Sequence, residues 1–164
     1  MRAQNDFRIS GRFTIEHVRD GKVIAEYEIP NGIVDVGLNH ILETEFHDGS
    51  HVTTWYIGLV DDAGFSAFAA GNTMSSHAGW VECTSYDEVN RPTWTAGAAT
   101  SRQIANASPV IFTISAVKNI KGLFVTSNNS KGGTAGTLWA TATFGSSVPF
   151  VDNDVLRVTY TING

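Results

Sequence analysis

The chain has 164 residues, which is enough to bury a core without disulfide bonds and suits one domain better than two. Its net charge is −5 and its 11 basic residues are scattered, which argues against nucleic acid or an anionic membrane surface as a partner. Only 16% of the residues are charged. Much of the surface must therefore be small or uncharged, which suits protein–protein contact but also occurs in β-sandwiches without an obligate partner.

The first predicted element is a β-hairpin. Apolar residues alternate with polar ones from Phe7 to Ile15, as in a half-buried strand. Asp20-Gly21 is a tight-turn signal. The return strand is predicted over residues 23–29, and Pro30-Asn31-Gly32 is expected to end it.

One helix is predicted, over residues 35–46. Its apolar side chains share one face, which we expect to pack against a sheet or to cover its end: Leu38, Ile41, Leu42 and Phe46. Asp35 is the expected N-cap, and Gly49 lies just past the expected end.

The rest of the chain predicts short strands separated by turn residues. They are expected over residues 52–60, 80–86, 93–95, 110–115, 120–127, 137–144 and 155–162. Residues 61–76 are expected to form a loop that could contain a helical turn over 66–70, and residues 96–107 a loop of small residues. This pattern predicts an all-β fold with one short helix, a β-sandwich of jelly-roll type, as a single domain over residues 1–164.

The termini and the cysteine count also bear on the compartment. Met1 to Asp6 begins no apolar run, so we expect no signal peptide but a possible N-terminal arm that reaches a neighbour. No stretch approaches the ~20 apolar residues of a membrane helix, so we expect synthesis in a cytoplasm. The single cysteine, Cys83, excludes an intramolecular disulfide and is predicted to be a buried small hydrophobe.

Each candidate for a chemical site in the sequence favours a structural interpretation. The glycine-rich segment 131–137 precedes a strand, whereas a phosphate cradle needs a helix after the glycines. His40, Glu43 and His47 share a helix face, with His51 nearby, but a polar stripe opposite an apolar one is typical of a solvated face.

The remaining two motifs are equally weak. Asp61-Asp62 is best interpreted as a solvated turn, because adjacent side chains point apart. No Gly-x-Ser-x-Gly nucleophile motif occurs in the sequence. We therefore predict no catalytic residue, no metal site and no cofactor, and a protein that is not an enzyme.

Aromatic residues provide the predicted contact sites. Trp55 and Trp139 lie in alternating runs and are expected in the core. Trp94 follows Arg91 at a loop-to-strand junction, where the pair could anchor an interface. Phe65 and Phe68 lie in an apolar stretch of a long loop, a second candidate interface.

Several segments resemble small virion proteins of tailed phages, over roughly residues 31 to 162. They are Gly37-Leu38-Asn39, Thr54 to Leu59, Thr73 to Glu82, Tyr86, Arg91 to Trp94, Lys121 to Ser127 and Gly136 to Ala140. The similarity is to jelly-roll cement or decoration proteins of phage heads. It implies a location on the outer capsid surface, the major capsid protein as partner, and a dimer or trimer. A tail-associated or carbohydrate-binding module, with exposed aromatics at one end of the sandwich, is the alternative.

Overall fold

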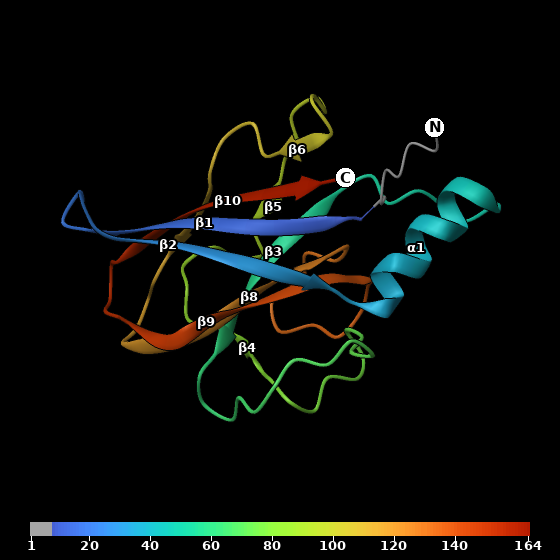
Figure 1. Cartoon of the computed structure of the whole chain (residues 1–164). Helices are drawn as coiled ribbons and strands as arrows, with labels where there is room; N and C mark the ends of the chain where they lie inside the picture. The colour runs from blue at the N-terminus through green and yellow to red at the C-terminus, as the bar shows by residue number, and fades with distance from the viewer. Residues whose placement is uncertain (1–7) are drawn as a thin grey trace.

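The computed structural model describes residues 8–164, so the expected N-terminal arm, residues 1–6, lies outside the described residues. In chain order the elements are β1 (Ser10–Arg19), β2 (Lys22–Ile33), α1 (Asp35–Phe46), β3 (Trp55–Asp61), β4 (Glu82–Cys83), β5 (Thr93–Trp94), β6 (Gln103–Ala105), β7 (Val110–Thr113), β8 (Lys118–Thr126), β9 (Leu138–Phe150) and β10 (Val155–Asn163). Figure 1 shows the strands stacked in two layers, with α1 at one end.

The strands form a curled antiparallel sheet that folds over on itself. β2, β1 and β10, with the short β6 and β7, form the first layer. β9, β8 and β3, with the short β4 and β5, form the second. The first and last strands pair from Ser10↔Asn163 to Val18↔Val155. The predicted all-β, jelly-roll-like sandwich with one short helix is confirmed.

β2 belongs to both layers. It pairs with β1 as far as Asn31 and then with β9 at Gly32↔Thr141 and Ile33↔Ala140. The expectation that the strand ends at Pro30 is therefore wrong. At Pro30 the strand has a partner only on its β1 side, a position where a missing N–H is tolerated.

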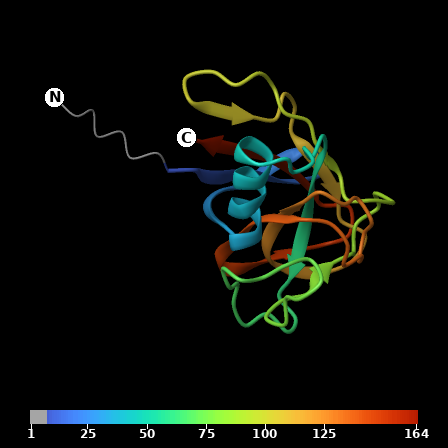
Figure 2. The same cartoon turned by 90° about the vertical axis from the view of Figure 1, so that its right-hand side faces the viewer.

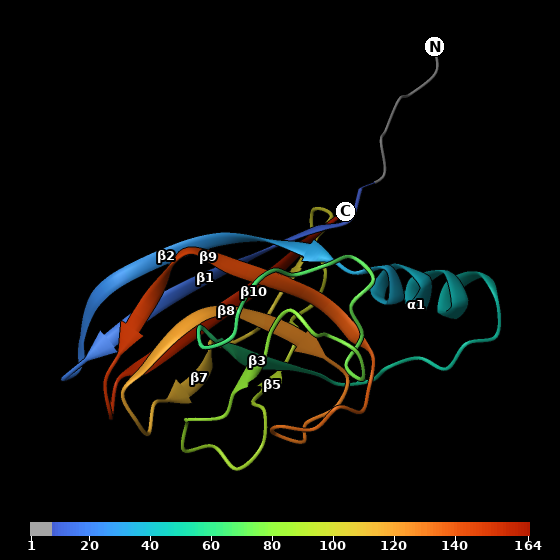
Figure 3. The same cartoon turned by 90° about the horizontal axis from the view of Figure 1, so that it is seen from below.

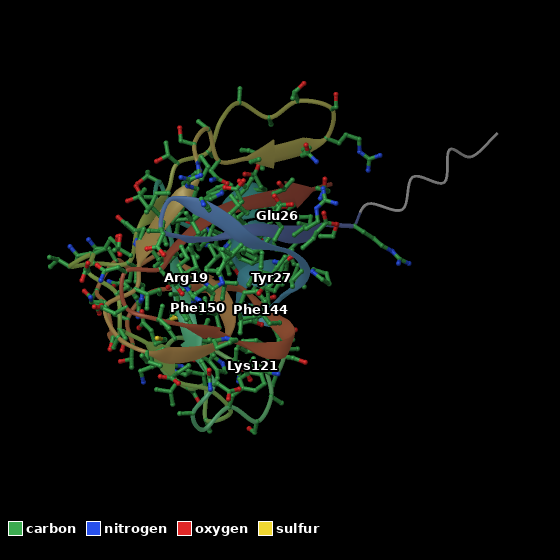
Figure 4. All side chains as sticks on the ribbon, turned by 90° about the vertical axis from the view of Figure 1, so that its left-hand side faces the viewer. Arg19, Glu26, Tyr27, Lys121, Phe144 and Phe150 are labelled. Atoms are coloured by element: carbon green, nitrogen blue, oxygen red, sulfur yellow. The ribbon has the colours of Figure 1, made fainter. Side chains whose placement is uncertain are left out.

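The two layers separate along most of β2 and β9. Tyr27 and Phe144 fill this gap with their rings edge to face, 5.1 Å between centroids, and Figure 4 shows them side by side between the layers. Between the layers lies the main core, which includes the fully buried Phe13, Leu123 and Tyr160. Alternation along the strands places these side chains inward, as the sequence predicts.

A second apolar cluster lies on the outer face of the second layer. Phe124 and Leu138 project from the sheet and are covered by Met74 and Trp80 from the segment between β3 and β4. Figure 3 shows this long segment in front of the strands that it covers. The segment is irregular at residues 66–70, so the expected helical turn there is absent from the described chain.

The outermost strands of the two layers are linked by isolated bridges. Tyr86 pairs with Ile114 and Ala96 pairs with Asn106, so the edge beside β3 is joined to the edge beside β10. β6 lies in the segment that we expected to be a loop. The small residues around it give no period-2 signal, and the partner that makes β6 a strand is β10, far away in the sequence. The bridges limit the strand edge available to other chains.

α1 lies against the end of the sandwich and makes few contacts with it (Figures 1 and 2). Gly37 is its buried residue, and a Cβ added there would lie 2.5 Å from the Trp139 carbonyl oxygen. The sequence predicts Asp35 as the N-cap, and that prediction is wrong. In the structure the N-cap is Val34. The backbone N–H of Asp35 instead donates to the carbonyl oxygen of Ala70 at 2.9 Å.

Candidate functional site

Arg91, a predicted interface residue, is buried in the chain, and its contact with a partner stays a prediction. Its guanidinium donates to both carboxylate oxygens of Glu82, at 2.9 and 2.7 Å. It also donates to the carbonyl oxygens of Asn128 and Gly133, at 2.9 and 2.6 Å. The guanidinium lies over the Phe124 ring, 5.2 Å from its centroid. Arg91 is therefore occupied inside the chain, where it holds the loop between β8 and β9.

Trp94 is also buried, with only 7% of its surface exposed. Its indole N–H donates to the backbone carbonyl of Tyr160 at 3.1 Å. Its side chain is thus used mainly within the chain, and that Trp94 anchors an interface stays a prediction. The same observation removes Trp94 as an exposed platform for a sugar, and the tail or carbohydrate alternative stays a prediction. The sequence of residues 91–94, between a loop and a strand, does not reveal that the side chains of Arg91 and Trp94 both turn inward.

Phe65 and Phe68 are half-buried on the second apolar cluster. Their rings lie edge to face at 5.1 Å, and Phe68 packs against Trp80 at 5.7 Å. The ammonium of Lys121 lies 5.6 Å from the centroid of the Phe65 ring. Much of this apolar surface is therefore used within the chain. That these two residues contact a partner stays a prediction.

The predicted polar motifs have structural partners. Glu43 and His47 form an exposed pair at 2.7 Å, whereas His40 turns toward the Trp55 ring. Asp61 pairs with Lys118 at 2.7 Å. Across residues 8–164, no group of three His, Cys, Asp or Glu side chains is placed to hold a metal ion.

The glycine-rich loop is held by its lysine. Lys131 donates to the carbonyl oxygens of Tyr86 and Glu88, at 2.8 and 2.6 Å, and lies over the Tyr86 ring. The strand predicted after the loop is present as β9. Among the described helices, none is long and apolar enough to cross a membrane.

Two further predictions for single residues are met. Cys83 is buried, and burial raises the pKa of its thiol. Trp139 is in the core, as expected, whereas Trp55 stays half-exposed at its margin. For Cys83, these apolar surroundings disfavour a reactive thiolate.

Sequence reasoning missed a buried ionic cluster at the end of the sandwich away from α1. His17 and Asp154 lie 2.7 Å apart, and Arg19 donates two hydrogen bonds to Asp154, each at 2.7 Å. Burial alone would raise the pKa of Asp154, but the bonds from Arg19, the Val151 amide and His17 hold it well below its usual value. Through His17 and Arg19, the cluster anchors β1 to Asp154, in the turn before β10.

A pocket of about 190 Å³ lies between α1 and the end of the sandwich. Its aromatic walls come from three strands of the second layer and one of the first: Trp55, Trp94, Trp139 and Tyr160. Trp55 and Trp139 are tilted toward each other, with 5.9 Å between ring centroids. Figure 2, which faces this end, shows α1 in front of these strands.

The rim of this pocket is polar, and most of its residues come from α1 and the segment that follows it. His40, Glu45 and His51 supply two imidazoles and a carboxylate. In the floor, Trp139 donates its indole N–H to the Tyr160 hydroxyl at 2.8 Å. Burial raises the pKa of Tyr160, so this hydroxyl stays neutral. The pocket thus combines aromatic walls with an acidic, imidazole-bearing mouth.

The outer side of α1 carries an apolar stripe made of Leu38, Leu42 and Phe46. Their exposed fractions are 42%, 57% and 83%. We expected this face to pack against a sheet or to cover its end; α1 does lie over the end of the sandwich, but these three side chains stay exposed there. Only Ile41 of the predicted apolar face packs against the main core. Periodicity shows that a helix has an apolar face, but it does not show whether the chain itself covers that face.

Comparisons with known proteins return no match: no family model fits the chain, and neither its sequence among curated proteins nor its fold among solved structures finds a similar protein.

Proposed function

We propose that the chain is a structural protein of a tailed-phage virion, a cement or decoration protein that binds the outside of the head. In this role it bridges major capsid subunits, acts as a dimer or trimer, and is made in the host cytoplasm. The observation that carries the proposal is the α1 stripe, three large apolar side chains in a row that the described part of the chain leaves uncovered.

The energetics of this stripe favour a macromolecular partner. Each buried Leu or Phe side chain contributes about 1.5–3 kcal/mol when it is removed from water. Leu38, Leu42 and Phe46 lie at intervals of four residues along one side of a helix, a spacing that suits docking into an apolar groove. A capsid presents the same groove many times, so modest contacts add up through avidity and stabilise the assembled shell by linkage.

Charge limits the partner further. α1 carries Asp35, Glu43 and Glu45 and has neither Lys nor Arg in its sequence. A groove with basic residues at its rim complements this helix, whereas packing α1 against a second α1 brings like charges together. We therefore expect the stripe to face the capsid, and any contact between copies of the chain to use another surface.

The test is a binding assay with expanded heads from phage that lack this protein. The double variant Leu42→Ser, Phe46→Ser should bind at least about tenfold more weakly, because it loses two apolar contacts. Val89→Ser is the matched control, since Val89 is 84% exposed but lies far from α1 in the sequence. Equal binding of the double variant and the wild type, or no binding of the wild type with no change in head stability, would refute the proposal.

A further inference from the structure

The aromatic pocket beneath α1 has features that select a ligand by its charge, separately from the stripe on the outer side of the helix. Its volume of about 190 Å³ is large enough to hold several ligand atoms, because a cavity of only about 10–15 Å³ already holds one water. The pocket opens to solvent beside Trp55, which is half-exposed. It is therefore a reachable site and not a closed packing defect.

The pocket offers aromatic faces, and two of its three indole N–H groups are already used in its floor. Trp94 gives its N–H to the Tyr160 carbonyl, and Trp139 gives its N–H to the Tyr160 hydroxyl. An uncharged sugar that entered this floor would find few partners for its hydroxyl groups, and unmet hydroxyls are costly to bury. A group that interacts through its C–H atoms and its charge meets no such penalty.

The ring arrangement suits a cation. Trp55 and Trp139 meet at 53°, and Trp94 and Tyr160 at 62°, so the walls face the space from different directions. A cation near such faces is attracted by the negative centre of each ring, and tryptophan is the strongest partner. Several tilted aromatic walls around one space form the arrangement that holds alkylammonium groups.

The charge of the rim also favours a cation. Glu45 lies at the mouth, and the described residues that line the pocket include neither Lys nor Arg. The whole chain carries a net charge of −5, which favours the approach of cations over anions.

We propose that this pocket binds an alkylammonium group on an apolar stem, in the aromatic space between Trp55, Trp94 and Trp139, with Glu45 as its counter-charge. The proposal goes beyond the capsid-binding role and does not depend on it, because it concerns the inner side of α1 and not the stripe. A ligand of this class could be a small quaternary amine or the end of a lysine side chain, which share the same chemistry.

The experiment compares choline with its uncharged carbon analogue, 3,3-dimethylbutan-1-ol, on the full chain. Indole N–H signals in NMR spectra report binding, and the chain supplies its own reference. Trp55, Trp94 and Trp139 line the pocket, whereas Trp80 lies in the outer cluster. Choline should shift the three pocket signals with a millimolar Kd, leave the Trp80 signal in place, and bind at least about tenfold more tightly than the uncharged analogue.

Two matched variants test the charge. Glu45→Gln should weaken choline binding roughly fivefold or more, whereas Glu43→Gln, on the same helix but paired with His47 outside the pocket, should leave it unchanged. Trp55→Leu, which keeps apolar bulk but removes a ring at a half-exposed position, should weaken binding as well.

Any of four results would overturn the proposal. Equal affinity for choline and its uncharged analogue would show an apolar pocket without charge selection. Binding of methyl hexopyranosides with no response to choline would show a sugar site. Equal choline affinity of the Glu45→Gln variant and the wild type would remove the role given to the carboxylate. No choline binding by the wild type would remove the site itself. The N-acetyl methylamide of lysine, tested in parallel, distinguishes a side-chain ligand from a small quaternary amine.

Discussion

The outer face of the second layer and the helix end of the sandwich each gather aromatic rings, but only the first is closed. Over the second layer, Trp80 is 2% exposed, stacks on His77 at 4.1 Å and donates its indole N–H to Asn72 at 3.1 Å. At the helix end, Trp55 remains half-exposed beside an open pocket.

The difference lies in the segments that cover the rings. The chain between β3 and β4 is long and irregular, so it can follow the aromatic surface and supply polar partners such as Asn72. α1 is a rigid cylinder that touches the sheet mainly at Gly37 and Ile41. A helix seated at so few residues leaves space beneath it. The closed region is thus built for stability, and the open one is available for binding.

Arg91→Ala should be the most damaging change in the closed region. It leaves the Glu82 carboxylate without its partner and two carbonyl oxygens without donors, which should cost about 3–5 kcal/mol of unfolding free energy. Urea unfolding measures this loss. Arg157→Ala is the control, since its 3.5 Å pair with Glu16 is exposed and should contribute less than about 1 kcal/mol. Similar losses in both variants would contradict the assignment of Arg91 as an internal anchor.

Asp154 is a second buried carboxylate with ionic partners, and because it titrates, its contribution to stability can be tested by changing the pH. Asp154→Asn should lower the unfolding free energy at neutral pH by about 1.5–3 kcal/mol, since charged hydrogen bonds are lost. The pKa of Asp154 is lowered in the folded chain, so its contribution is present above the unfolded-state value of 3.8 and is lost as the pH falls below it.

Chemical unfolding between pH 2 and 7 checks this prediction. The variant and the wild type should differ most at pH 6–7, and the difference should shrink as the pH falls from about 4 toward 2. A difference that stays constant with pH would mean that the carboxylate charge of Asp154 is not what the fold uses.

Gly37→Ala tests how α1 is seated. The added methyl group would lie 2.5 Å from the Trp139 carbonyl oxygen, so the helix must move, at a cost of about 1–3 kcal/mol. Alanine's better helix propensity offsets up to about 1 kcal/mol of this. Thermal unfolding gives the change. At Gly32 a methyl group meets no heavy atom within 4 Å, and Gly32→Ala should be neutral or slightly stabilising.

Phe46→Ser should have the smallest effect on stability, within about 0.5 kcal/mol, because the side chain is 83% exposed. The measurement is the same urea transition. A loss above about 2 kcal/mol would place Phe46 in the chain's own core and remove it as a contact for a partner.

The strands were the most predictable part of the molecule. Alternation identified β1 and β10, whose inward residues form the main core, because a half-buried strand imposes its period on the sequence. β6 could not be found in this way, since a three-residue edge strand depends on its partner and not on its own pattern. The switch of β2 between layers depends on β9, which lies about a hundred residues later.

The sites were less predictable than the fold. Trp and Arg are residue types that often anchor interfaces, but they can anchor a core equally well when their loop turns inward. Only the tertiary structure shows that the side chains of Arg91 and Trp94 point inward. Conversely, the apolar face of α1 could be predicted from the sequence, but the exposure of its side chains to solvent could not. The pocket combines residues of β3, β5, β8, β9, β10 and α1, so no local signal could have indicated it.

The pairing of β1 with β10 has a consequence for how the protein is made. The residues of this pair are separated by up to about 150 positions, so the first layer cannot assemble until almost all of the described chain has left the ribosome. Until then β1 and β2 can form only a hairpin, which is marginally stable alone. Folding should therefore be late and slow for the length of the chain, because the entropy of a very long loop must be lost before the first layer closes.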